Sequence, residues 1–569
     1  ALVLAEVSGE LDEINCDALS LSQKYGDAFS VGYTLHYTAK QAVFDVKKIE
    51  TALCKAEPEV DLYETKEDNE DQLRLKVYHQ GSPLTLSDVM PILENMGLRA
   101  ISELPFEIKL GEKADNIWIH DFLLEPQSAK ETIALSEIKE QFEDAFIQIW
   151  SGRVENDTLN TAVTLTGMTW QETIILRTYV RYLKQINYPF SRDYIQCALI
   201  ENPKMSRSII EFFKTSFDPE IKSGRDKKIE NHKIELEQGL QKVDSLDQDR
   251  TLRKIIELIS ATLRTNYYQR DENGNPKPCL SIKLNSAKIP GLPKPVPFRE
   301  IFVYSPQVEG IHLRGGEIAR GGLRWSDRHE DFRTEVLGLM KAQMVKNAVI
   351  VPVGAKGGFV VKINTETREE FQKAGIECYK TFIRGLLDIT DNLKGKKVIP
   401  PKNVVRHDGD DPYFVVAADK GTASFSDIAN TISQDCGFWM DDAFASGGSA
   451  GYDHKKMGIT AKGAWESVKL HFRHLNHNIQ EQEFDAVGVG DMGGDVFGNG
   501  MILSKHTRLI GAFNHLHIFC DPDPNPENSF KERKRLFKAV KGWDQYNKSY
   551  LSKGGDIFNR TDKTLRISK

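Results

Sequence analysis

A lysine between glycines is the first residue of this sequence whose surroundings suggest chemistry. Lys356 lies in VPVGAKGGFVVKI, residues 351–363, with an apolar, β-branched run on each side. A buried ammonium group is costly unless it is paired or loses its charge. Glycines also let another group approach the backbone closely. The stretch therefore predicts a lysine held at the mouth of a buried strand pair.

Other cations are spaced so that they can reach the same cleft. Arg320 precedes a glycine turn, and a helix with an apolar stripe follows it. Near the end of that helix, Gln343 and Lys346 fall on the same turn, and AVIVPVG, residues 348–354, then reads as a buried strand. The order of these elements lets Arg320, Lys346 and Lys356 converge on one cleft.

Three cations around one cleft repel each other, so the arrangement suits a ligand with two negative charges, such as a dicarboxylate. Burial and cationic neighbours both disfavour protonated Lys356, and we expect its pKa to fall from about 10.4 towards the range of a general base. Spacing alone supports equally well the alternative of surface lysines beside an ordinary glycine turn.

An aspartate occupies a second candidate position. YFVVAADKGTASFSDIANTI, residues 413–432, reads as an apolar strand, a sharp turn that carries Asp419, and a helix. Enzymes of the α/β class place reactive groups at the carboxyl ends of strands. Considered by itself, Asp419 is more simply explained as a helix-capping residue.

A glycine fingerprint follows. FDAVGVGDMGGDVFGNGMILS contains Gly488, Gly490 and Gly493 as GxGxxG, after a strand-like run and before a helix-compatible one, which is typical of a pyrophosphate-binding turn. The later strand HLHIFCD ends in Asp521, whose carboxylate fits a ribose 2′-hydroxyl and favours NAD over NADP. Asp523 could replace it. A glycine-rich loop that binds no nucleotide is the alternative.

Bulk composition sets the limits for these sites. The chain has 569 residues, which suggests about three or four domains, and a net charge of −7, which disfavours nucleic acid or an anionic membrane as partner. The cysteines are scattered without CxxC spacing, so we expect reduced thiols, no metal site and a cytoplasmic location. No apolar run approaches the length of a membrane span.

The elements that must position these residues suggest an α/β multidomain chain. Strand-like stretches at 29–38, 73–80 and 117–125, with helical patterns at 38–53 and 85–99, predict a ferredoxin-like α+β domain over 1–127. The pattern of strand-like and helix-like segments predicts three further regions: a helical region at 128–275, an α/β substrate domain at 276–455 and a partial Rossmann-type domain at 456–569. Mixed charges at 221–254 predict a solvated helix pair.

These motifs in this order resemble the glutamate dehydrogenase superfamily. GGLR at 321–324, Lys346, GAKGG at 354–358, Asp419 and the later GxGxxG carry the resemblance. The sequence is most similar to the very large NAD-specific glutamate dehydrogenases, in which ACT-like regulatory domains and a helical segment precede the catalytic core. GYTLHYTAKQAVFDVKKIE and IWIHDF fit that N-terminal part.

The resemblance implies a role for each matching residue. Lys356 matches the catalytic lysine that helps water attack an imino-acid intermediate, and Asp419 matches the aspartate that carries protons to and from the amine. Gln343 and Lys346 match groups that hold the substrate α-carboxylate, while Arg320 stands where relatives use a lysine for the distal carboxylate. The matching cofactor-binding residues are Thr460, near the nicotinamide, and Gly488, Gly490 and Gly493, at the pyrophosphate.

The implied activity is NAD-dependent oxidative deamination of the small molecule L-glutamate to 2-oxoglutarate and ammonia, in a homo-oligomer with a possible amino-acid effector at the N-terminal domain. One alternative is a dehydrogenase of an apolar amino acid such as leucine or phenylalanine. Another is a non-catalytic protein that senses amino acids. Because the chain stops soon after the second nucleotide-binding strand, we expect it to be part of a longer enzyme.

Overall fold

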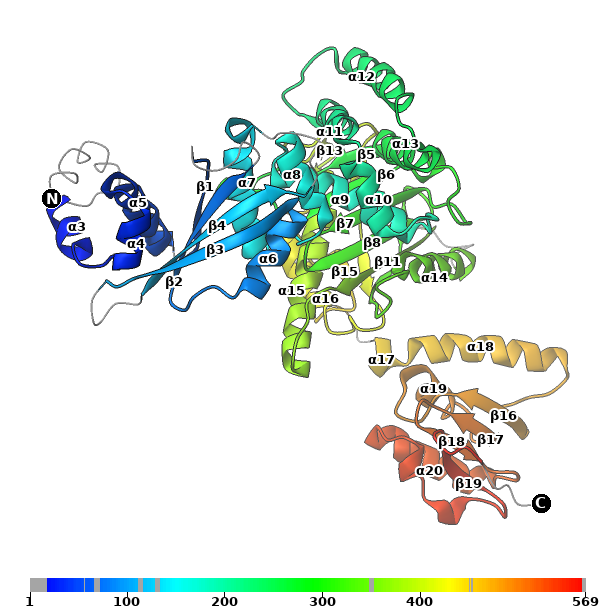
Figure 1. The fold of residues 1–569 in the computed structure, drawn as a ribbon. Helices are drawn as coiled ribbons and strands as arrows, with labels where there is room; N and C mark the ends of the chain where they lie inside the picture. Colours follow the sequence, from blue (N-terminus) through cyan, green and yellow to red (C-terminus); the bar gives the residue numbers. More distant parts are fainter. Residues whose placement is uncertain are drawn as a thin grey trace. The chain divides into compact units, whose positions relative to one another are not determined.

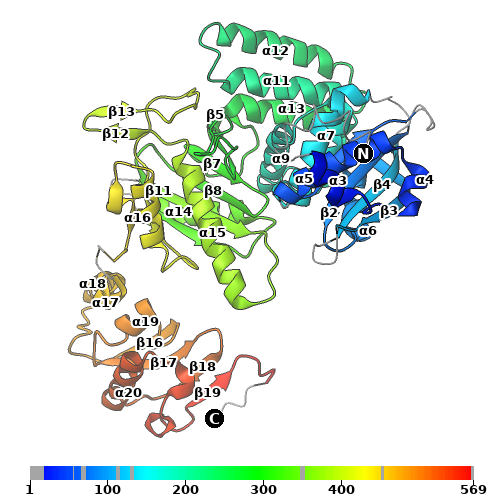
Figure 2. The same cartoon turned by 90° about the vertical axis from the view of Figure 1, so that its left-hand side faces the viewer.

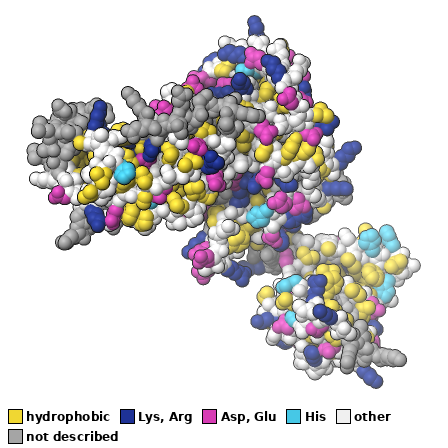
Figure 3. Space-filling view, in the orientation of Figure 1, with side chains coloured by type: hydrophobic (Ala, Val, Ile, Leu, Met, Phe, Trp, Pro, Cys, Tyr) yellow, Lys and Arg dark blue, Asp and Glu magenta, His cyan; other side chains and the backbone are white. Residues whose placement is uncertain are grey.

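A computed structural model of the chain describes residues 18–55, 57–65, 72–110, 116–127, 134–346, 353–449, 451 and 454–564. It divides into two compact units, Ala1–Ala445 and Ser446–Lys569, which are taken separately below (Figures 1 and 2). None of the described helices is both long enough and apolar enough to span a bilayer. On the face drawn in Figure 3, basic and acidic side chains are interspersed over the first unit.

The N-terminal part of the first unit is an antiparallel sheet in the order β1-β2-β4-β3. Its elements are α3 (Ala18–Tyr25), α4 (Val31–His36), α5 (Ala39–Lys55), β1 (Glu59–Tyr63), β2 (Leu73–Gln80), α6 (Leu86–Asn95), β3 (Leu98–Ile108) and β4 (Ile117–Pro126). Because β4 lies between β2 and β3, the β2–α6–β3 crossover is a split βαβ unit. The predicted α+β sandwich is confirmed.

The strand predicted at 29–38 is wrong, because this segment contains helix α4. The Ser30 side chain accepts a hydrogen bond from the Tyr33 backbone N–H at 3.2 Å and caps the helix. Tyr33 and Tyr37 are four residues apart, and their ring centroids lie 4.8 Å apart on the same helical face. The aromatic residues that suggested a strand therefore follow a helical period.

The helical region predicted after residue 128 is also present. Its helices are α7 (Leu135–Trp150), α8 (Thr161–Thr166), α9 (Trp170–Gln185), α10 (Arg192–Ile200), α11 (Pro203–Phe217), α12 (Arg225–Leu240) and α13 (Leu246–Ala261). The charged stretch 221–254 forms the expected helix pair, but only the first of the two helices is largely solvated. On α12 only Leu236 and Leu240 are buried, whereas α13 buries an apolar stripe that includes Leu252 and Ile255.

A large mixed sheet follows, in the order β15-β14-β10-β11-β8-β7-β6-β5, with β9 paired to β11. The strands are β5 (Thr262–Thr265), β6 (Leu280–Leu284), β7 (Arg299–Tyr304), β8 (Val308–Arg314), β9 (Ala319–Arg320), β10 (Gly322–Trp325), β11 (Val353–Val361), β14 (Val416–Ala418) and β15 (Ala445–Ser446). β12 (Asn392–Lys394) and β13 (Lys397–Ile399) form a separate hairpin. Helices α14 (Phe332–Lys346), α15 (Arg368–Leu387) and α16 (Ser426–Asp435) complete this part.

Helices cover both faces of the large sheet. On β7, Phe302 and Tyr304 share a core with the helical region and α14, whereas Ile301 and Val303 share a core with α15 and α16. The first of these cores runs from Leu159 to Val360, and β5 already belongs to the sheet. The segments 128–275 and 276–455 thus share one hydrophobic core, and the boundary placed between them falls inside it.

The second unit contains a smaller sheet in the order β16-β17-β18-β19. Its elements are α17 (His454–Met457), α18 (Ile459–His474), β16 (Phe484–Val489), α19 (Asp495–Gly500), β17 (Thr507–Phe513), β18 (His517–Cys520), α20 (Pro526–Ala539) and β19 (Asp556–Asn559). β16 and β17 are parallel, and the remaining pairs are antiparallel. Within the described residues β16 pairs only with β17, and the side chains of Val487 and Val489 are 71% and 72% exposed.

Candidate active site

Three parallel strands bring Lys356 and Asp419 together from positions 63 residues apart in the sequence. β10 pairs in parallel with β11, which carries Lys356, and with β14, which Asp419 follows. The Lys356 Nζ lies 2.6 Å from the Asp419 Oδ2, and both side chains are mostly buried. The two residues to which the resemblance assigned proton transfer and water attack therefore form a direct ion pair.

Sequence reasoning missed a second layer of charge beside this pair. Arg324 Nη2 lies 3.4 Å from the Asp419 Oδ1, and Arg324 Nη1 donates to the Glu335 Oε1 at 2.9 Å. Ser326 Oγ donates to the other oxygen of Glu335 at 2.6 Å. Arg324 belongs to the GGLR motif, and Glu335 lies in the first turn of α14. The opposite charges of a strand residue and a residue of the following helix were the sequence signal that could have predicted this pair.

The neighbours of Asp419 keep its carboxyl group ionised. Partial burial acts to raise the pKa of Asp419, but the hydrogen bond and charge of Lys356, assisted by Arg324, outweigh burial and lower the pKa below its ordinary value. The charged partner that the structure gives Lys356 is thus a carboxylate. Among the described side chains, the group in contact with the Lys356 ammonium is this carboxylate and not the cluster of cations expected from the sequence.

The other predicted substrate ligands lie on neighbouring elements. Arg320 is exposed on β9, where it pairs with Gly354, two residues before Lys356 on β11. Gln343 is half-buried on α14, and Lys346 is the last residue of that helix, with its side chain outside the described part of the structure. Most of the strand predicted at 348–354 also lies outside the described residues.

The glycines around Lys356 serve close packing of the chain on itself. A Cβ at Gly321 would lie 1.5 Å from the Ala355 carbonyl oxygen, and one at Gly354 would lie 2.8 Å from the Gln343 carbonyl carbon. A Cβ at Gly357 would lie 3.0 Å from the His312 Cδ2. These glycines hold β11 against α14 and the strands beside it, and so fix the position of Lys356.

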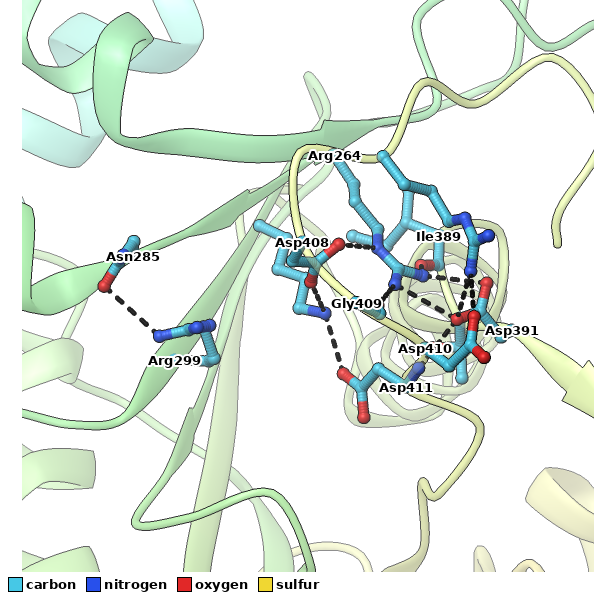
Figure 4. A network of polar contacts seen from close by, with 12 residues as sticks. Arg264, Asn285, Arg299, Ile389, Asp391, Asp408, Gly409, Asp410 and Asp411 are labelled. Carbon is cyan, nitrogen blue, oxygen red and sulfur yellow. Dashed lines mark hydrogen bonds and ion pairs between the residues drawn. The ribbon is translucent and has the colours of Figure 1, made fainter. Parts of the chain in front are cut away.

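A buried network of ion pairs anchors the segment that leads to β14 (Figure 4). Arg264 donates to Asp408 at 2.6 Å and to Asp391 at 3.0 Å, and the Lys283 Nζ lies 2.7 Å from Asp411. Arg314, on β8, also binds Asp411. Burial acts to raise the pKa of Asp411, but the two cations hold it well below its usual range. The loop before Asp419 is therefore tied to β5, β6 and β8.

In the second unit, the fingerprint glycines lie at the end of β16 and in the turn that leads to α19. The chain then continues into β17, which pairs in parallel with β16. Gly490 has φ +137°, a region open mainly to glycine, and its N–H donates to the Phe513 carbonyl at 2.7 Å. A Cβ at Gly488 would lie 2.5 Å from the Phe497 Cε2. Within the turn, Asp491 accepts a hydrogen bond from the Gly493 N–H at 2.9 Å and another from the Asn514 side chain at 2.7 Å.

The predicted ribose ligands lie elsewhere in this unit. β18 runs antiparallel to β17, and the Asp521 N–H donates to the Ile510 carbonyl, three residues before the end of β17. Asp521 is fully buried, and its Oδ1 accepts from the Ser552 N–H at 3.0 Å. Asp523 is exposed and pairs with Arg508. The structure brings Asn514 to the glycine turn instead, because it follows β17, the parallel neighbour of β16.

Thr460 lies in the first turn of α18 and is exposed. Gly458 caps this helix with φ +61°. Thr460 therefore lies at the start of a helix, and its contact with the nicotinamide stays a prediction.

Comparisons with known proteins agree along most of the chain. A family model described as "Bacterial NAD-glutamate dehydrogenase, catalytic domain" matches residues 235–569. Models for the glutamate dehydrogenase ACT3 domain, helical motif 3 and helical motif 2 match residues 57–138, 154–219 and 16–52. These matches confirm an ACT-like part and a helical part, but the ACT3 match begins at residue 57, and residues 16–52, which the sequence analysis assigned to the ACT-like domain, match a helical motif.

Curated relatives share close sequence similarity with this chain. It is 53% identical to an NAD-specific glutamate dehydrogenase of Halomonas elongata over 96% of its length, and 51% identical to one of Pseudomonas aeruginosa over 95%. A third, from Mycobacterium tuberculosis, is 46% identical over 96% of this chain. The match covers 34% of each relative, so the chain spans about a third of their length.

Proposed function

Because the chain belongs to the bacterial NAD-glutamate dehydrogenase family, we propose that it forms part of an enzyme that oxidatively deaminates L-glutamate to 2-oxoglutarate and ammonia. The observation that carries the proposal is the ion pair between Lys356 and Asp419, with 2.6 Å between the Nζ and Oδ2 atoms. A paired lysine and carboxylate in one mostly buried site can exchange protons with a substrate amine and with water.

The charge states of the pair suggest a division of work. Asp419, with its lowered pKa, is ionised at neutral pH and can accept a proton from the substrate ammonium group. Lys356 is within hydrogen-bond distance of that carboxylate and can orient the water that attacks the imino carbon. Gln343 and Lys346 would hold the α-carboxylate, and Arg320 the distal carboxylate.

The glycine turn of the second unit fits a dinucleotide. Gly490 adopts a backbone conformation that a side chain would disfavour, and parallel strands flank the turn as a pyrophosphate site requires. When bound, NAD would supply the hydride acceptor. Gly488, Gly490 and Gly493 would contact the pyrophosphate, and Thr460 the nicotinamide side. Ribose binding by Asp521 or Asp523 stays a prediction, and Asn514, which follows β17, contacts the turn through its hydrogen bond to Asp491.

Substitutions of the pair test the proposal in the full-length enzyme. We expect Lys356→Ala and Asp419→Asn to lower kcat for glutamate by about 100- to 10,000-fold, because each removes one partner of the proton-transfer pair. Binding of NAD, measured by calorimetry, should persist in both variants. The readout for turnover is NADH formation.

Lys420→Ala is the matched control, since Lys420 adjoins Asp419 and its side chain is 67% exposed. It should leave kcat unchanged. Wild-type turnover by Lys356→Ala, at normal NAD affinity, would rule out the assigned role.

The substrate class has its own test. If Arg320 holds the distal carboxylate, Arg320→Ala should raise KM for glutamate and reduce the preference for glutamate over leucine. An unchanged preference would remove Arg320 from the site. A homo-oligomeric state, an amino-acid effector at the ACT-like domain and a cytoplasmic location remain predictions for the complete protein.

A further inference from the structure

A separate cavity lies in the first unit, where its N-terminal and catalytic parts meet. Its volume is about 310 Å³, within the range of small-molecule sites. The walls come from the turn after α7, the start of α9, the loop between β5 and β6, and the turn between β7 and β8. Since α7 packs on β1, the cavity joins the N-terminal sheet to the large sheet.

The cavity is remote from the Lys356–Asp419 pair along the sheet. The Lys362 N–H donates to the carbonyl of Gln307, which lines the cavity, and Lys362 is six residues beyond Lys356. Six residues of extended strand span about 20 Å. A ligand in this cavity would therefore occupy a different site from the proposed substrate.

One buried polar group in the wall has no partner. Tyr304 is 1% exposed, and its hydroxyl makes no hydrogen bond within the described part of the chain. A buried hydroxyl without a partner is unfavourable, and such groups call for an explanation. The hydroxyl atom is itself enclosed by the protein, so a ligand in the cavity does not reach it.

The charges around the cavity all have one sign. Arg153, Arg270 and Lys277 line it, and none of the described lining residues is Asp or Glu. Arg153 pairs with Glu57 and Lys277 with Asp388, neither of which lines the cavity. Arg270 donates to two backbone carbonyls and has no carboxylate partner among the described residues. A negative ligand group would therefore find an uncompensated cation at Arg270.

The apolar part of the wall suits a flat ring. Trp170 and Tyr267 contribute aromatic side chains, and Ile174 and Leu280 contribute aliphatic ones. Flat faces of this kind bind aromatic groups by stacking and by edge contacts. We propose that this cavity binds a small organic anion with an aromatic body, whose negative group faces Arg270. The proposal goes beyond the proposed function and does not rest on it.

Three naphthalene probes test the proposal by isothermal titration calorimetry on the 569-residue chain. 1-Naphthyl phosphate and 1-naphthylacetate carry the two common anionic groups, and 1-naphthylacetamide is the neutral match. We expect at least one anion to bind with a Kd at or below about 1 mM and the amide to bind about 10-fold more weakly. The tighter anion identifies the physiological group as phosphate or carboxylate. Absence of binding by both anions, or equal affinity for the amide, overturns the proposal.

Variants then locate the bound anion. Arg270→Gln should weaken binding about 2- to 10-fold, because it removes the cation that faces the negative group. Tyr304→Phe should bind normally, because the enclosed hydroxyl does not meet the ligand. Arg250→Gln, an exposed arginine on α13, is the control and should bind normally. Unchanged affinity in Arg270→Gln overturns the proposal, as does loss of binding in Lys356→Ala.

Discussion

Arg324 is the residue that connects Asp419 to α14, since it contacts both Asp419 and Glu335. Among the described side chains it pairs with Glu335 and Asp419 and not with Arg320 or Gln343, so we regard it as a positioning residue. Its cation also contributes to the lowered pKa of Asp419, after the larger effects of burial and Lys356. Its removal should therefore affect both the geometry and the acidity of the site.

We predict that Arg324→Gln lowers kcat/KM in the full-length enzyme and moves the acidic limb of its pH profile upward. The reason is that loss of a nearby cation raises the pKa of the Asp419 carboxyl group, which then protonates at a higher pH. Arg324→Lys, which keeps the positive charge, should show a smaller upward shift of the acidic limb than Arg324→Gln. Arg328→Gln is the control, because Arg328 pairs with Asp331 at the surface. A profile identical to wild type would show that Arg324 does not act on Asp419.

His312 lies beside Gly357 and is fully buried, with neither ring nitrogen bonded within the described residues. Burial and the nearby charge of Arg314 lower its pKa from 6.5 to about 3, although Asp411 acts in the opposite sense. Below pH 6.5 the unfolded chain therefore binds a proton that the folded chain excludes. Stability is lost as the pH falls from about 6.5 towards about 3.

We predict that His312 destabilises the first unit by about 2 kcal/mol at pH 5 relative to pH 7. His312→Leu should remove this part of the pH dependence, measured by urea denaturation at the two pH values. His36→Leu, at an exposed histidine of α4, should keep it. Equal pH dependence in His312→Leu and wild type would contradict a buried neutral imidazole.

Among the elements, β11 depends on glycine at its crossing with β9 and β10. We predict that Gly321→Ala destabilises the first unit by about 3 kcal/mol or more and abolishes turnover, because the new Cβ meets the Ala355 carbonyl beside Lys356. Gly338→Ala, in the open middle of α14, should instead stabilise it by about 0.5–1 kcal/mol. Urea denaturation and NADH formation measure the two effects. Normal activity in Gly321→Ala would contradict the packing argument.

The outcome of sequence reasoning differs by the kind of pattern. Helices such as α9 were predictable because their apolar faces repeat at helical spacing, and the GAKGG and DKG motifs marked Lys356 and Asp419. Segment 29–38 was not, since tyrosines at a four-residue period look like strand formers when only their types are read. The contact of Arg324 with Asp419 depends on strand order, which local spacing does not contain.

The same limit applies to the residues around the glycine turn. Asp521 follows β18, which is antiparallel to β17, and its N–H bonds the Ile510 carbonyl rather than a residue of the turn; its contact with a ribose stays a prediction. Strand direction is a property of the whole sheet. A sequence with the right residue types therefore predicted the fold class of the second unit but not which polar side chain meets its turn.

At the scale of the whole molecule, each unit has its own hydrophobic core. Leu313 on β8 belongs to the core of the first unit and Leu509 on β17 to that of the second, and both are fully buried. We predict two thermal transitions by calorimetry. Leu313→Ala should lower the temperature of one transition and Leu509→Ala that of the other. Each substitution should cost about 2–5 kcal/mol in the free energy of unfolding of its unit. A single transition that moves with both substitutions would contradict independent folding.

The open side of β16 has a consequence for the behaviour of the purified chain. Within the part of the chain that the structure describes, the backbone donors and acceptors on this side of β16 have no strand partner, and with two exposed valines they form a template on which a further copy can add a strand. Light scattering should therefore grow steeply with protein concentration, and Val487→Lys should suppress it, while Val31→Lys on α4 should not. Equal scattering from the wild type and both variants would show that the aggregation-prone surface is not the open side of β16. If the prediction holds, the purified chain should be stored at low concentration or as Val487→Lys.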